Sequence, residues 1–67
     1  MKPTLGRIVF YTFEGTGKVA PAMVVKVYGD DCVNLRVFTD DGENPAYKSS
    51  VRLGEVGKPD SWAWPPR

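Results

Sequence analysis

The feature that most constrains this chain is a series of short runs rich in β-branched and aromatic residues, separated by turns of Gly, Pro and Asp. Alternation is cleanest over residues 32–38, CVNLRVF, where apolar residues alternate with Asn34 and Arg36. Successive side chains of a strand lie on opposite faces, so this period indicates a strand with one apolar and one polar face. No window has a sustained helical period. The other predicted strands are residues 7–13, 19–28, 46–53 and a short terminal run from residue 61.

Four or five short strands joined by such turns favour an all-β fold that closes, or nearly closes, into an antiparallel barrel. The 67 residues leave room for one domain, residues 1–67, and a small SH3-like barrel is the architecture expected at this length. The turn at residues 29–31 predicts a hairpin between the second and third strands. Pro21 cannot donate to a sheet ladder, which predicts an edge or a bulge early in the second strand.

The same period assigns side chains to faces. We expect Asn34 and Arg36 to point to solvent, with Lys26 of the paired strand on the same outer surface. In the second strand, the alternation separates Met23, Val25 and Val27 from Val24, Lys26 and Tyr28. In the fourth strand, one face is expected to hold Tyr47, Ser49, Val51 and Leu53.

Small size predicts self-association. A domain of about 60 residues buries only about 60% of the surface of its unfolded chain, so it needs support beyond an ordinary core. Cys32 is the only cysteine and histidine is absent, so neither a disulfide nor a structural zinc site is expected. Tight aromatic packing and association remain, and we expect a homo-oligomer, a dimer or larger.

The composition argues against catalysis. Without histidine there is no Ser-His or Cys-His pair, and a lone Cys32 reads as a small core residue. The carboxylate pairs Asp30–Asp31 and Asp40–Asp41 lie in turns, where aspartate is favoured for its bonds to nearby backbone amides. The acidic loop of residues 39–45 lacks the ligand spacing of a calcium loop and reads as a turn. We expect no enzyme, no cofactor and no metal.

Nine basic and eight acidic residues give a net charge of +1, which argues against nucleic acid as a partner. No run of 18 apolar residues is present, so no membrane partner is expected. The first residues lack the apolar stretch of a signal peptide, and a free cysteine fits a reducing compartment. These features predict a cytoplasmic protein.

Two groups of residues are candidates for binding. Trp62 and Trp64 are two apart, so in an extended segment both rings project from the same side. They either cover an end of the barrel as a lid or provide a binding platform or subunit contact. The second group could hold a planar ligand bearing a phosphate, or could be an ordinary solvated sheet face. It comprises Lys26, Tyr28, Asn34, Arg36 and Phe38, with Arg7 as a further candidate.

Four segments in order carry a likeness that spans nearly the whole chain: GRIV followed by Tyr11, PAMVVKV, VNLRVFTD and the ending SWAWP. With them the chain resembles a family of short proteins encoded by tailed bacteriophages and prophages. The family usually has histidine where this chain has Ala63, and often tryptophan where this chain has Ala46–Tyr47. The resemblance implies a phage origin and the host cytoplasm, but no particular activity.

Three functions remain open for such a phage accessory protein. The first is a non-enzymatic binding module, which in its sharpest form sequesters a nucleotide immune signal between subunits through Lys26, Arg36, Arg7 and the tryptophans. The second is a protein-interaction module that docks on a host or virion component through its tryptophan end. The third, a small nucleic-acid-binding barrel, is disfavoured by the near-neutral charge.

Overall fold

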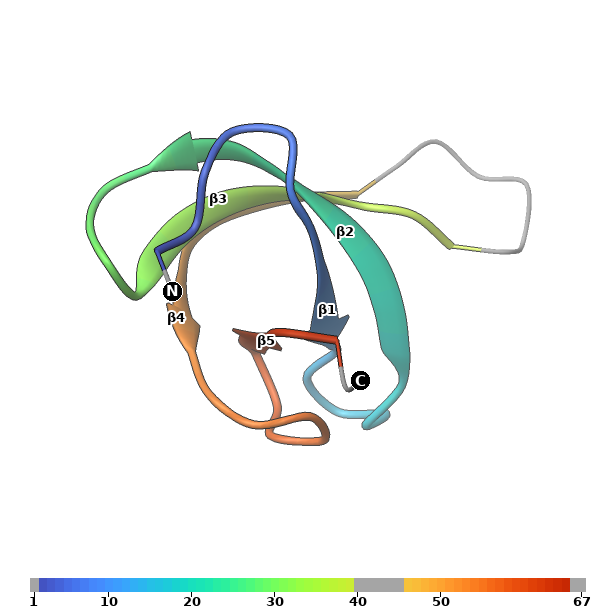
Figure 1. The fold of residues 1–67 in the computed structure, drawn as a ribbon. Coiled ribbons are helices and arrows are strands. Elements are labelled where there is room, and N and C mark those ends of the chain that lie inside the picture. Colours follow the sequence, from blue (N-terminus) through green and yellow to red (C-terminus); the bar gives the residue numbers. More distant parts are fainter. Residues whose placement is uncertain (1, 40–45, 66–67) are drawn as a thin grey trace.

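Five strands follow one another in the computed structural model, which describes residues 2–39 and 46–65 (Figure 1). Their positions agree with the predicted runs to within about two residues at each end, because glycine, proline and aspartate interrupt the chain where strands stop. The strands are β1 Ile8–Thr12, β2 Val19–Val27, β3 Cys32–Val37, β4 Ala46–Leu53 and β5 Ser61–Ala63.

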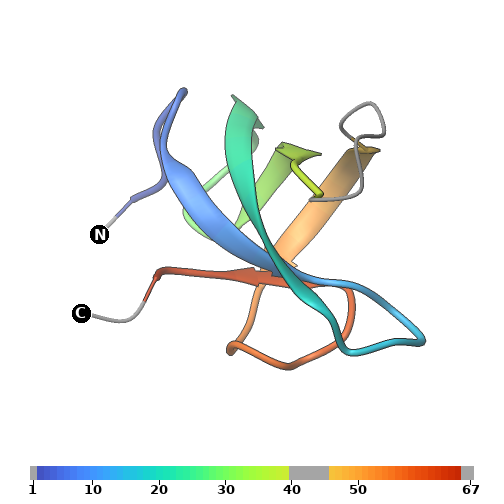
Figure 2. The same cartoon turned by 90° about the vertical axis from the view of Figure 1, so that its right-hand side faces the viewer.

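The strands close into a barrel in chain order, with β5 returning to β1. The pairs β1–β2, β2–β3, β3–β4 and β1–β5 are antiparallel, and the predicted hairpin between β2 and β3 is confirmed. The β4–β5 pair departs from the expected antiparallel pattern, because Arg52 and Leu53 run parallel to Ser61 and Trp62. Figure 2 shows β5 lying beside β1, with the chain between β4 and β5 turning at that end of the barrel. The all-β fold and the small SH3-like barrel are therefore confirmed.

The barrel interior is filled from every strand by the inward-facing half of each alternation. Trp62 is the largest fully buried side chain, and Tyr11 and Leu35 follow it. An indole buries about 150–250 Å², so one tryptophan supplies a large share of the core that a domain of this length can build. The remaining core residues are Val9, Ala20, Ala22, Val24, Val33, Val37 and Val51.

A β-bulge in β4 overturns one predicted face. Val33 pairs with Val51 and Leu35 with Lys48, so two serines of β4, Ser49 and Ser50, lie opposite Asn34 alone. The extra residue reverses the alternation beyond it. Tyr47 is consequently 51% exposed while Val51 is 3% exposed, and the prediction that they share a face was wrong. A register shift in β2 between Val24 and Lys26 has the same effect, because Val24 is buried and Lys26 is exposed. The prediction that Val24 and Lys26 share a face was therefore also wrong.

The segment between β4 and β5 is fixed to β1. The Tyr11 hydroxyl donates to Asp60 Oδ1 at 2.7 Å, and the Gly57 amide donates to Thr12 Oγ1 at 3.0 Å. Burial, followed by the hydrogen bond and the negative charge of Asp60, raises the pKa of Tyr11 above that of an ordinary tyrosine. Tyr11 is therefore a neutral structural donor that closes this end of the barrel. No helix within the described residues has the length and apolarity needed to cross a membrane.

Candidate functional site

The structure separates the predicted binding residues into four places. The four places are the outer face of β2 and β3, a stacked pair of a cation and a ring, the wall of a pocket, and the core. The outer face holds Lys26, Tyr28, Asn34 and Arg36, the stacked pair is Arg7 and Trp64, the pocket wall includes Phe38, and Trp62 lies in the core.

Asn34 organises the outer-face group, which together with Tyr47 we name the tyrosine cluster. Its side-chain amide donates to the Tyr47 hydroxyl at 2.8 Å and to the Tyr28 hydroxyl at 3.3 Å. Its side-chain oxygen accepts the Ser50 amide at 2.8 Å. Lys26, its partner on β2, is exposed, which places Asn34 on the outer face as predicted. The predicted solvent exposure was wrong, because Asn34 lies beneath the tyrosines and is 4% exposed.

The bulge explains why an amide is needed at this position. Ser50 has a φ of 53°, in the left-handed region that residues other than glycine rarely adopt. Its amide leaves the regular ladder and takes the Asn34 oxygen instead. Both amide protons of Asn34 and its oxygen are thereby engaged, so the side chain positions the two tyrosines and has no donor left for a ligand.

Two cations flank the tyrosine rings. Lys26 Nζ lies 5.0 Å from the centre of the Tyr28 ring, and Arg36 Cζ lies 5.2 Å from the centre of the Tyr47 ring. These distances are typical of cation–π contacts. Arg36 and Tyr47 are also direct cross-strand partners. Sequence reasoning missed Tyr47 as a site residue, because only the register across the bulge brings it to this face.

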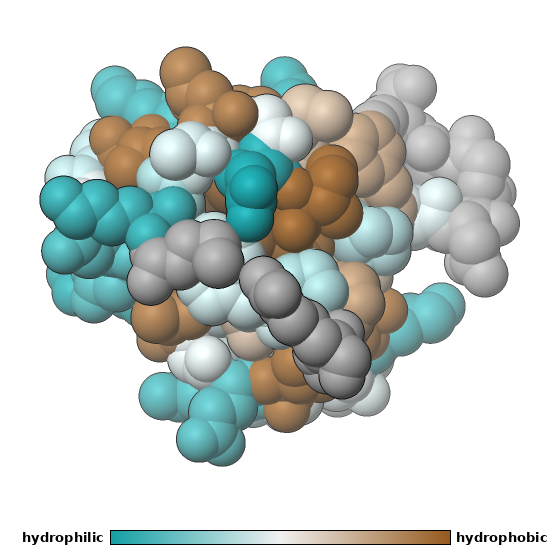
Figure 3. All heavy atoms as spheres, in the orientation of Figure 1, coloured by the Kyte–Doolittle hydropathy of each residue, from teal (hydrophilic) through white to brown (hydrophobic). Residues whose placement is uncertain are grey.

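Apolar side chains continue the tyrosine cluster across the outside of the sheet. Cross-strand pairing forms one row, Ile8–Met23–Arg36–Tyr47, that runs over four strands. All of its side chains are exposed, including Ile8 at 45%. Figure 3 shows hydrophobic and hydrophilic residues intermingled over the face seen in the orientation of Figure 1. The outer face therefore combines aromatic, aliphatic and basic groups.

The tryptophan end is mostly structural. Trp62 is fully buried, and its indole nitrogen donates to the Asp31 carbonyl at 2.9 Å, so its assignment as a ligand-binding residue was wrong. The Trp64 ring meets the Trp62 ring edge to face, with 5.3 Å between their centres. This contact agrees with the prediction that both rings project from the same side. Trp64 is half-buried, and Arg7 Cζ lies 5.5 Å from the centre of its ring.

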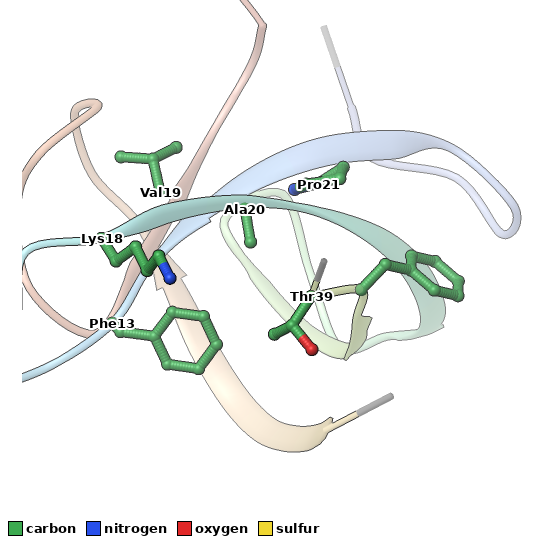
Figure 4. Close-up of a pocket in the computed structure, with 7 residues that line it drawn as sticks. Phe13, Lys18, Val19, Ala20, Pro21 and Thr39 are labelled. Carbon is green, nitrogen blue, oxygen red and sulfur yellow. The ribbon is translucent and has the colours of Figure 1, made fainter. Parts of the chain in front are cut away.

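A pocket of about 310 Å³ lies beside the β1–β2 hairpin, where the end of β3 meets β2 (Figure 4). Phe38 lies in its wall together with Phe13, which sequence reasoning did not select. No pattern in the sequence indicates the pocket, because its walls come from segments that only the barrel brings together. The full lining is Phe13, Lys18, Val19, Ala20, Pro21, Phe38 and Thr39.

Neither a family model, nor a curated protein, nor a solved structure matches this chain. The likeness to short phage proteins therefore stays a prediction. Among residues 2–39 and 46–65, no three His, Cys, Asp or Glu side chains gather as a metal site. Most of the acidic turn considered above, residues 40–45, lies outside the described residues.

Proposed function

We propose that this protein is a non-enzymatic binding module that docks on an acidic protein surface through the tyrosine cluster and the adjoining outer row. The observation that carries the proposal is Asn34, a nearly buried amide that fixes two exposed tyrosines from beneath. Tyrosines held in place lose less conformational freedom when a partner binds, and this favours affinity.

Charge supports an acidic partner. The ion pairs between described residues are Lys2–Asp30 and Arg52–Asp31, and neither involves Lys26 or Arg36. Both cations are exposed and lie against tyrosine rings, so a carboxylate from a partner could pair with either one while the rings exclude water. Tyrosine, methionine and arginine are also enriched at protein interfaces.

Shape favours a protein over a small ligand on this face. Small-molecule sites are concave, whereas the tyrosine cluster lies on the outside of a closed barrel. Two cations are also few for nucleic acid, whose affinity rests on many phosphate contacts. In the setting that the phage resemblance implies, the partner would be a host or virion protein in the host cytoplasm. Docking would use the outer face, because the buried Trp62 leaves little of the tryptophan end for contact.

Site-specific crosslinking tests the proposal. A Met23→p-benzoylphenylalanine variant carries the crosslinker in the centre of the outer row, and a Val56→p-benzoylphenylalanine variant carries it at an exposed position between β4 and β5. We expect irradiation in host cells to join position 23, but not position 56, to one defined protein. Adding Arg36→Glu should abolish that product.

Three results would overturn this function. Equal products from both positions would show that the outer row has no special role. Crosslinks only between copies of this chain would make the face an oligomer interface, which fits the expected homo-oligomer but not a separate partner. A nucleotide that raised the melting temperature and shifted the NMR signals of Tyr28 and Tyr47 would favour sequestration of a nucleotide on this face instead.

A further inference from the structure

The pocket beside the β1–β2 hairpin is built as a preformed concavity. The Phe13 amide donates to the Lys18 carbonyl at 2.8 Å, and the Gly17 amide donates back to the Phe13 carbonyl at 3.2 Å. The Phe38 amide donates to the Pro21 carbonyl at 2.9 Å, which ties the end of β3 to β2. These bonds hold the pocket walls in place without a ligand. The volume of about 310 Å³ lies at the lower end of the range for small-molecule sites, about 300–1,000 Å³.

Its walls are apolar and aromatic. Phe13 is held edge to face against the buried Tyr11, with 5.1 Å between ring centres, so its orientation is fixed by the core. Phe38 adds a second ring to the lining. Pro21 also belongs to the lining, but its ring lies on the other side of β2 from Ala20 and Phe13 in Figure 4. Figure 4 shows Phe13 and Lys18 on one side of the pocket and Thr39 on the other, with Ala20 between them. A flat apolar body would fit such walls, because aromatic rings stack or meet edge to face.

The charge in the pocket has one sign. Lys18 is the only charged residue of the lining, and it makes no ion pair with another described residue. Lys48 Nζ lies 5.8 Å from the centre of the Phe13 ring and adds a second positive charge nearby. A lysine at the edge of an apolar cavity favours a ligand that ends in a carboxylate, a phosphate or a sulfonate.

We infer that this pocket is a binding site for a small planar molecule with an apolar ring system and one anionic group, held by Phe13 and Phe38 with Lys18 as the counter-charge. The site goes beyond the proposed docking function, because none of its lining residues belongs to the tyrosine cluster. It also supplies the concave surface that the outer face of the barrel does not.

A matched pair of probes tests the site. 2-Naphthoate carries the anionic group, and 2-naphthamide has nearly the same shape without the charge. In a ¹H–¹⁵N NMR titration, we expect 2-naphthoate to shift the amide signals of Phe13, Lys18 and Phe38 and to bind about fivefold to tenfold more tightly than 2-naphthamide. Lys18→Gln should remove this preference and Lys18→Arg should retain it. Lys26→Gln, which removes the same charge from the tyrosine cluster, should leave both affinities within about twofold.

Three results would overturn the site: no saturable binding of 2-naphthoate, shifts centred on Tyr28 and Tyr47, or equal losses from Lys18→Gln and Lys26→Gln. Each variant is compared only if its thermal unfolding remains cooperative. Because Lys18 is exposed, Lys18→Gln should meet that condition.

Discussion

Two aromatic groups in the described part of the molecule, the tryptophan end and the tyrosine cluster, are opposite in use. At the tryptophan end, Trp62 fills the barrel and donates its indole proton to Asp31. In the tyrosine cluster, Tyr28 and Tyr47 stay half exposed, and the polar residue between them is the buried one. The first cluster completes the core, whereas the second presents rings to solvent on a polar support. Aromatic content alone therefore does not tell core from binding surface, and hydrogen-bond partners do.

The largest loss of stability should follow from removing the buried indole of Trp62. Trp62→Ala leaves a cavity in the barrel and the Asp31 carbonyl without its partner, and we expect a loss of about 3–5 kcal/mol in the free energy of unfolding. In a domain this small that loss should unfold most of the protein, as measured by urea denaturation. Tyr28→Ala, at a 53% exposed position, should cost about 1 kcal/mol or less. Equal losses would break the distinction between the two clusters.

A smaller effect is expected at Gly54, which follows β4 and lies against Ser61 of β5. A Cβ added at Gly54 would lie 2.7 Å from Ser61 Oγ and 2.8 Å from Ser61 Cβ. Ser61 cannot yield freely because its hydroxyl donates to the Lys58 carbonyl at 2.7 Å. Gly54→Ala should therefore lower the free energy of unfolding by about 1–3 kcal/mol in chemical denaturation. Gly29→Ala is the matched control, since a Cβ there meets nothing within 4 Å and should change stability little.

Removing the Asn34 side chain should test whether this amide holds the two tyrosines in place. Asn34→Ala deletes the donor to both tyrosines and leaves the Ser50 amide at the bulge without its acceptor. We expect this change to lower the free energy of unfolding by about 1–3 kcal/mol. The Tyr28 and Tyr47 ring signals should lose their dispersion in NMR spectra while the core signals persist. Ser49→Ala, at the other serine of the bulge, is the control. Unchanged ring signals in Asn34→Ala would mean that the tyrosines are not held by this amide.

The gentlest perturbation is alkaline pH, which acts through Tyr11. Its pKa is raised in the folded protein, mainly by burial and next by Asp60, so its contribution to stability is complete below the ordinary tyrosine pKa of about 10. Above that pH the unfolded chain ionises while folded Tyr11 stays neutral. Stability should then fall by up to about 1.4 kcal/mol per pH unit from this group. Urea denaturation from pH 9 to 11 should show a steeper loss in the native protein than in Tyr11→Phe, and parallel slopes would contradict this role.

Much of the fold follows from local signals, and the site does so only in part. Alternation and turn residues located the strands, because period and turn chemistry are written in neighbouring residues. The same alternation brought Asn34 and Arg36 to one face, but it grouped Lys26 with the buried Val24, and only the register shift in β2 brings Lys26 beside Asn34. It could not reveal the bulge opposite Asn34, since one inserted residue moves later side chains to the other face and depends on the partner strand.

The tryptophans show the same limit. Their spacing predicted that both rings project together, but not that barrel closure would bury Trp62 and leave Trp64 half covered. The pocket at Phe13 and Phe38 was also beyond sequence reasoning, because β1, β2 and the end of β3 meet there only in three dimensions.

The most direct test of the central claim compares the two clusters in binding. The partner identified by crosslinking from position 23 is first purified. Calorimetry then gives the dissociation constants of its complexes with Tyr47→Ala and Trp64→Ala, after thermal unfolding has shown that both variants are folded to the same extent. If the tyrosine cluster is the docking surface, Tyr47→Ala should weaken binding by about 30-fold, the size of an interface hot spot, and Trp64→Ala by less than about threefold. The reverse order would place the binding surface at the tryptophan end and contradict the account.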